Sequence, residues 1–142
     1  MPKLKKHQLS FDNDYDYDLI GICSHYSDYR LVWSMNEALG LSLEKGRELF
    51  LVSGKKVGET KGFPNYEMID EEAMLQLYLI KNAHERKYLI PEKQQIDYFL
   101  FICDNVSIDV DAWVNKLREI DGVMAAYAFD PTEFASTEQI VF

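Results

Sequence analysis

The sequence has 142 residues, of which 15 are Lys or Arg and 24 are Asp or Glu, giving a formal net charge of -9 at pH 7. A chain of this length with 47% apolar residues is typical of one globular domain, so we treat residues 1–142 as a single unit. The acidic balance argues against nucleic acid or an anionic membrane as a partner, because both bind Lys and Arg and repel carboxylates.

The apolar segments are too short for a bilayer. The most hydrophobic one, residues 98–103, falls far below the roughly 20 residues that a membrane-spanning helix needs. The lysines among the first six residues are followed by polar residues, not by the apolar stretch of a secretory signal. Cys23 and Cys103 both lie in apolar segments, which predicts reduced, buried thiols. We therefore expect a cytoplasmic protein that does not enter a membrane.

The amino-terminal part predicts a strand followed by a helix. The apolar run 19–23 suits a buried strand. Ser27 is a suitable N-cap for a helix over 28–39, where apolar residues recur every three to four positions, and Gly40 is a suitable end. The sequence therefore predicts an amphipathic helix packed on a sheet.

The middle of the chain predicts strands. Residues 48–53 favour a strand, and 54–62 hold three Gly and three Lys, which is typical of a flexible loop at a hairpin tip. Two further strands are expected around 63–69 and 74–80, separated by an acidic turn.

The last third predicts a second strand–helix–strand unit. Residues 96–103 form the most hydrophobic strand, and Ser107 or Asp109 can cap a helix that Gly122 would close. Residues 123–129 predict another strand, and the final three residues a short edge strand.

The overall pattern predicts an α+β fold. We expect a two-layer sandwich with a largely antiparallel sheet of about six to seven strands and both helices on one face. Cys23 precedes Trp33 by ten residues, and Cys103 precedes Trp113 by the same ten. A duplicated strand–helix–strand unit would explain this spacing, but the helix faces do not match, so chance similarity is favoured.

An acidic run alternates along the chain at Asp12, Asp14, Asp16 and Asp18, which share one face if the segment is a strand. No register places Gly at the sixth and Glu at the twelfth position of a calcium-binding loop. The pattern predicts a solvated acidic face on an edge strand or loop, with a weak cation site as the alternative.

Two other groups of residues have the chemistry of a binding site. Cys23, His25 and Cys103 could meet as soft metal ligands, but no fourth ligand is evident, so we expect no metal site. The Gly and Lys residues of 54–62 lack the spacing of a phosphate-binding loop, which favours a hairpin tip. No cofactor is expected.

One segment resembles a known motif: Ile90-Pro91-Glu92-Lys93-Gln94-Gln95-Ile96-Asp97-Tyr98. It is similar to the motif that names the IPExxxVDY family, small bacterial proteins without an established activity, with Ile96 where the name has Val. The resemblance extends over most of the chain, including the segments 19–22 and 28–31.

The chemistry of this nonapeptide favours a structural role. Pro91 suits the first position of a short helical turn, and Glu92 can accept bonds from its amides. In a strand that includes Ile96 and Tyr98, Asp97 would enter a mostly aromatic face beside Phe99, where it needs a basic or amide partner. Glu92 and Asp97 could act as general acid and base only if both enter one cleft.

The sequence shows no catalytic constellation, so we expect no enzyme. Our preferred hypothesis is a non-enzymatic module that binds another protein or itself through an exposed sheet face or edge, with a homodimer as one form. It rests on a surplus of aromatic residues, which anchor interfaces and cannot all be central. These include Tyr26, Tyr29, Tyr66, Tyr78, Tyr88 and Tyr127.

Two alternatives come from other classes. Strand–helix–strand pairs on one sheet resemble small-metabolite sensors of the ACT type, an analogy of fold alone. A small hydrolase using His84, Glu92 and Asp97 is least favoured.

Overall fold

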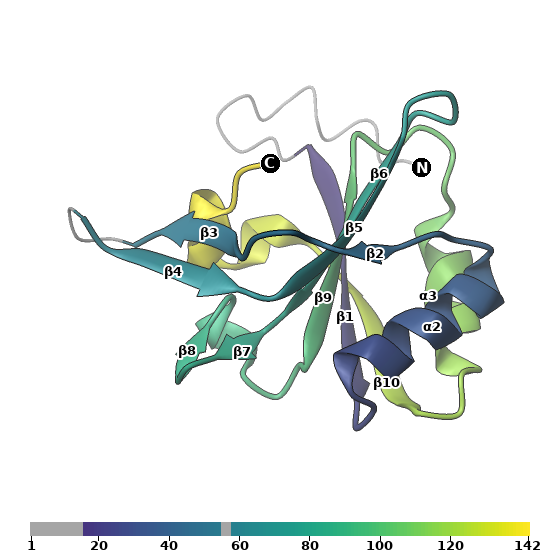
Figure 1. Ribbon diagram of the computed structural model, residues 1–142, viewed down its shortest axis with the longest axis horizontal. Helices are drawn as coiled ribbons and strands as arrows, with labels where there is room; N and C mark the ends of the chain where they lie inside the picture. Colours follow the sequence, from purple (N-terminus) through teal and green to yellow (C-terminus); the bar gives the residue numbers. More distant parts are fainter. Residues whose placement is uncertain (1–15, 55–57) are drawn as a thin grey trace.

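The computed structural model describes residues 16–54 and 58–142. A six-stranded sheet runs through the molecule in the order β10-β1-β9-β6-β5-β2, with every neighbouring pair antiparallel. Its strands are β1 (Tyr17–Ser24), β2 (Glu44–Lys45), β5 (Asn65–Asp70), β6 (Leu75–Lys81), β9 (Tyr98–Cys103) and β10 (Val123–Phe129). Helices α2 (Asp28–Leu39) and α3 (Val110–Arg118) cover one face of this sheet, while smaller elements cover part of the other (Figure 1). The predicted α+β class, antiparallel sheet and helical layer are confirmed.

Helix α2 (Asp28–Leu39) has the predicted bounds because both of its ends are capped. The Ser27 side chain accepts a hydrogen bond from the backbone N–H of Arg30 at 3.4 Å. Gly40 ends the helix with a left-handed φ of 66°, a conformation that costs glycine little.

Helix α3 (Val110–Arg118) begins as predicted but ends earlier. Asp109 accepts from the backbone N–H of Ala112 at 3.2 Å, which settles the choice between the two expected caps. The expectation that Gly122 closes the helix is wrong, because the chain leaves the helix after Arg118. Gly122 has a different role, since a Cβ there would collide with the ring of Tyr26.

The sheet combines two strand–helix–strand units. Strands β1, β6, β9 and β10 and the two helices follow one another as β-α-β-β-α-β, and these strands lie side by side as β10-β1-β9-β6. This is the split, ferredoxin-like arrangement. Strands β2 to β5 are inserted between α2 and β6, and two of them, β5 and β2, widen the sheet on one side.

The face away from the helices carries a second core. It is covered by two hairpins, β3 (Phe50–Ser53) with β4 (Thr60–Phe63) and β7 (Ala83–His84) with β8 (Lys87–Tyr88), and by the 3-10 helices η2 (Pro91–Lys93), η3 (Pro131–Glu133) and η4 (Ala135–Gln139) (Figure 1). Figure 1 shows these elements on the opposite side of the sheet from α2 and α3.

The predicted loop and the predicted edge strand differ from the structure. The hairpin tip is confirmed, because Ser53 pairs with Thr60, but β4 already begins within the predicted loop 54–62. Residues 55–57 of that loop lie outside the described residues. The expected edge strand over residues 140–142 is absent, since these residues follow η4 without strand pairing.

Candidate functional site

The buried side chain of Asn82 forms hydrogen bonds to three residues of the nonapeptide, although no pattern in the sequence marks it. Its side chain is 0% exposed. The amide nitrogen donates to the carbonyl oxygens of Lys93 at 2.9 Å and Ile96 at 2.8 Å, and the amide oxygen accepts from the N–H of Ile90 at 2.9 Å. The local sequence holds no signal for this role, because Asn82 stands between the charged Lys81 and the polar residues 84–87, and only the fold buries its amide, which must then find partners.

Asp97 lies before β9, not within it. The prediction that it enters the aromatic face beside Phe99 is therefore wrong, and Ile96 packs in the core of that face instead. The predicted need for a partner is met by a backbone amide, because Asp97 Oδ2 accepts from the N–H of Ser24 at 2.8 Å. The carboxylate thereby ties the nonapeptide to the end of β1.

Glu92 secures a different segment. Its two carboxylate oxygens accept from Ser136, one from the backbone N–H at 3.1 Å and one from the hydroxyl at 2.7 Å. Partial burial raises the pKa of Glu92, but hydrogen bonds from Ser136 and Ala135 outweigh this effect, so the pKa lies below its usual range. As predicted, Pro91 is the first residue of a short helical turn.

The three residues of the hydrolase hypothesis therefore bind separate parts of the chain. His84 lies on the β7–β8 hairpin with its Nε2 3.9 Å from a carboxylate oxygen of Glu85. Glu92 is bound to Ser136, and Asp97 to Ser24. None of the three lines either of the two clefts described below.

The cysteines lie far apart along the β1–β9 pair. Cys103 is opposite Tyr17 at one end of β1, whereas Cys23 lies at the other end, opposite Ala125 of β10. Both thiols are free, and burial followed by the nearby Asp104 raises the pKa of Cys103 to about 12. Across residues 16–54 and 58–142, no three His, Cys, Asp or Glu side chains form a group that could hold a metal ion.

The last aspartate of the acidic run, Asp18, lies in an interior strand of the sheet and not in an edge strand. Asp12 and Asp14 lie outside the described residues. β1, which holds Asp18, lies between β10 and β9, so the prediction of an edge strand or loop is wrong for this part. Asp18 Oδ2 accepts from the side-chain amide of Asn105 at 2.9 Å, which gives it a local structural partner.

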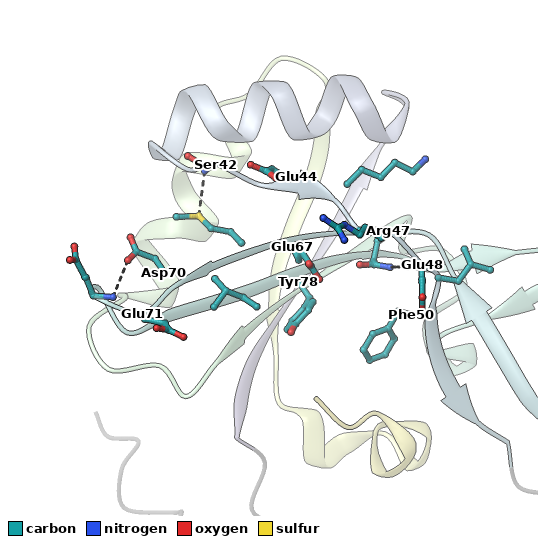
Figure 2. A pocket seen from close by; sticks show the side chains of 16 residues that line it. Ser42, Glu44, Arg47, Glu48, Phe50, Glu67, Asp70, Glu71 and Tyr78 are labelled. Carbon is teal, nitrogen blue, oxygen red and sulfur yellow. Dashed lines mark hydrogen bonds between the residues drawn. The ribbon is translucent and has the colours of Figure 1, made fainter.

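A cleft of about 1110 Å³ lies over β2, β5 and β6, beside β3 (Figure 2). Its floor includes Phe50, Ile69 and Tyr78. Figure 2 shows Tyr78 and Phe50 projecting from the sheet on the side away from α2. Six carboxylates and two cations line the rest: Glu44, Glu48, Glu67, Asp70, Glu71 and Glu72, with Lys45 and Arg47. The cleft is therefore acidic around an aromatic floor.

The strand register concentrates negative charge beside Tyr78. Glu67 of β5 is opposite Glu44 of β2 on one side and opposite Tyr78 of β6 on the other. Like charges at opposed positions destabilise a strand pair. Neither glutamate forms an ion pair with a Lys or Arg of the described residues.

An aromatic cluster separates this cleft from a second one of about 560 Å³ that is lined by Tyr17, Gln76 and Phe142 among others. The ring of Phe142 stacks on Tyr78 with 4.7 Å between centroids and contacts Phe50 at 5.1 Å. The Gln76 amide donates to the Tyr78 hydroxyl at 2.9 Å. These contacts fix the Tyr78 ring at the border of both clefts.

Asn65 positions the rim of the larger cleft. Its side-chain nitrogen donates to the carbonyl oxygen of Glu48 at 2.9 Å, and its own carbonyl accepts from the N–H of Gly46 at 2.9 Å. A Cβ at Gly46 would collide with the Asn65 side-chain oxygen, so the close approach of this rim requires glycine. Arg47 and Glu48 are thereby held at the cleft by a buried amide.

The outer edge of the sheet at β10 is protected. The strand contains no charged residue and no proline, the usual defences of an edge. Instead, Nε and Nη2 of Arg118 both donate to the carbonyl oxygen of Ala126, at 3.0 and 2.8 Å. A guanidinium from α3 thus occupies an acceptor that another strand would need.

No protein-family model matches the chain, and no curated protein does so either. Among the residues that the structure describes, neither helix is long and apolar enough to span a membrane.

Proposed function

We propose that the protein is a non-enzymatic module whose partner docks on the open part of the non-helical sheet face. The observation that carries this proposal is the cleft over β2, β5 and β6, where the helical layer and the two hairpins leave the sheet uncovered. Ile69 in its lining is 56% exposed, and Tyr78 and Phe50 line the same cleft. Exposed apolar surface rimmed by polar groups is the usual mark of a protein-binding site.

The face is favoured over the β10 edge because Arg118 already bonds to an edge carbonyl. A catalytic role is disfavoured, since His84, Glu92 and Asp97 bind separate segments. The net charge of -9 supports a protein partner over nucleic acid. A cytoplasmic location and membership of the IPExxxVDY family belong to this proposal, the latter on the resemblance of the nonapeptide and of segments such as 19–22 and 28–31.

Photocrosslinking tests the docking face. A benzophenone amino acid is placed at position 69 in the cleft, and at position 33 as the control, because Trp33 is equally exposed, at 63%, on the helical side. We expect light-dependent adducts in cells from position 69 only. The captured protein, once purified, should bind the wild type and lose about tenfold in affinity with Ile69→Asp. A second copy of this chain in the adduct would identify the homodimer. Equal adducts at both positions, or none at position 69, would rule out this face.

A metabolite-sensing module is the second candidate function, favoured by the ferredoxin-like order of β10, β1, β9 and β6 with two helices on one face. This support comes from fold alone. The candidate predicts that an amino acid or nucleotide raises the melting temperature, because a ligand that binds only the folded state stabilises it. A flat response across a panel of such metabolites would eliminate it.

A further inference from the structure

We infer that the occupant of the cleft is an extended peptide segment that carries Lys or Arg side chains. This inference rests on the proposed function, because it names the class of partner for the same face. It is based on three features of the cleft: an uncovered sheet face, aromatic side chains in its lining, and an excess of negative charge.

The excess of carboxylates in the cleft favours a positively charged occupant. Six carboxylates line the cleft against two cations, and the opposed pair Glu44 and Glu67 has no cation bound to it in the described chain. A cationic group between these strands would relieve their repulsion. An acidic partner would add to it, and a purely apolar one would leave it in place.

The aromatic side chains of the cleft can bind the cationic groups of Lys and Arg. An ammonium or guanidinium group that lies over a Tyr or Phe ring is attracted by the negative face of the ring, and a nearby carboxylate adds a charge-assisted hydrogen bond. Phe50 and Tyr78 have ring centroids 6.3 Å apart, and Glu67 is opposite Tyr78 in the strand register. Figure 2 shows Glu71 on the same side of the sheet as both rings.

The neighbouring edge suits an extended backbone. β2 pairs only with Tyr66 and Glu67, so in the described residues no strand pairs with the side of β5 away from β6 at Ile69 and Asp70. An added peptide strand can bond to such an edge through its main chain, while alternate side chains enter the adjoining pocket. A volume of about 1110 Å³ accommodates several side chains of such a strand.

Fluorescence anisotropy with labelled hexalysine and hexaarginine tests the inference, with hexaglutamate as the negative probe. The informative variant is Glu67→Gln/Glu71→Gln, and the matched control is Glu37→Gln/Glu119→Gln, which removes the same charge from exposed residues on and beside the helices. We expect about a tenfold loss of affinity for the cleft variant and less than about twofold for the control, because long-range charge contributes less than direct pairing. Equal losses in the two variants would overturn the inference.

Nuclear magnetic resonance locates the bound peptide. Addition of hexalysine should shift the methyl signals of Ile69 and leave the indole N–H of Trp33 unchanged. Shifts at Trp33 without shifts at Ile69 would overturn the inference. Its failure can be distinguished from failure of the proposed function: a captured partner that contacts position 69 with a segment lacking Lys and Arg disproves the basic occupant but supports the docking face.

Discussion

Asn82 shows how one buried amide can determine the path of a long loop. Its backbone N–H donates to the carbonyl of Asp97 and its carbonyl accepts from Leu89, in addition to the three side-chain bonds. Hydrogen bonds of this kind are worth most when they are buried, because a lost partner leaves the other group without water. The nonapeptide is therefore held mainly by a residue outside it.

Replacing Asn82 tests this role. We expect Asn82→Ala to lower the free energy of unfolding by about 2–4 kcal/mol, because it leaves the buried N–H of Ile90 and two carbonyls without their partner. Asn115→Ala, at an exposed position of α3, should change it by less than about 0.5 kcal/mol. Urea titration followed by circular dichroism measures both values. Equal effects would contradict the role of Asn82.

The Cys103 thiol makes stability depend on alkaline pH. Its pKa is raised from 9.0 to about 12 by burial and by the nearby Asp104. The folded chain thus holds the proton more tightly than the unfolded chain. This contribution is complete below about pH 9 and is lost as the pH rises toward 12, by at most about 1.4 kcal/mol per pH unit.

In Cys103→Val, the free energy of unfolding should fall less steeply with pH above about pH 9, because valine has a similar volume and no ionisable group. The free energy of unfolding between about pH 8 and 11 is the measurement, with Tyr98 left to provide the remaining slope because its pKa is also raised by burial. An unchanged slope in the variant would show that Cys103 is accessible to solvent.

At the scale of the element, the sequence predicted what local rules control. Ser27 and Gly40 marked both ends of α2, and residues 123–129 matched β10. The end of α3 was missed because Gly122 matches a common end signal, whereas its actual constraint is the distant ring of Tyr26. Such long-range packing leaves no trace in a local pattern.

For the candidate sites too, local features could be predicted from the sequence and long-range contacts could not. The turn at Pro91 was predictable, and so was the need of Asp97 for a partner. The identity of that partner, Ser24, was not, because it lies on another strand. The cleft was also missed, since it is formed only when β2 and β5 place distant carboxylates side by side. No continuous run of residues encodes it.

Glu92 connects the nonapeptide to η4, and this connection depends on pH. Because its folded pKa is lowered, the carboxylate stabilises the fold above the unfolded pKa of about 4.3, and this stability is lost as the pH falls through the folded value. We expect Glu92→Gln to speed hydrogen exchange in residues 135–139 at neutral pH, with a small effect on global stability.

Glu133→Gln is the control for this experiment, because Glu133 is exposed in the neighbouring η3. Mass spectrometry of the exchanged peptides distinguishes the two variants. If lowering the pH through the folded pKa of Glu92 does not bring the exchange of residues 135–139 in the wild type to that of the Glu92→Gln variant at the same pH, the carboxylate does not hold η4.

For the whole molecule, negative charge is poorly balanced. The net charge is -9, and the acid–base contact found within residues 16–54 and 58–142, between His84 and Glu85 at 3.9 Å, is an ion pair only when the imidazole is protonated. Salt should therefore stabilise the fold by screening repulsion. We expect about 0.5 M NaCl to raise the melting temperature by about 3 °C, measured by calorimetry.

The salt effect should be smaller in Glu67→Gln/Glu71→Gln than in Glu37→Gln/Glu119→Gln, since the first pair lines the cleft where carboxylates are most concentrated. A melting temperature that falls with NaCl would mean that attractive pairs dominate the surface.

Arg118 also bears on how the protein behaves at high concentration. Its two bonds to Ala126 occupy one carbonyl on the open edge of β10, and we expect this to hinder edge-to-edge growth of the sheet. We expect Arg118→Ala to form thioflavin-positive fibrils in samples where the wild type stays dispersed, and Arg118→Lys to be intermediate because an ammonium lacks the planar fork. A single guanidinium would then separate a protein that stores well from one that polymerises.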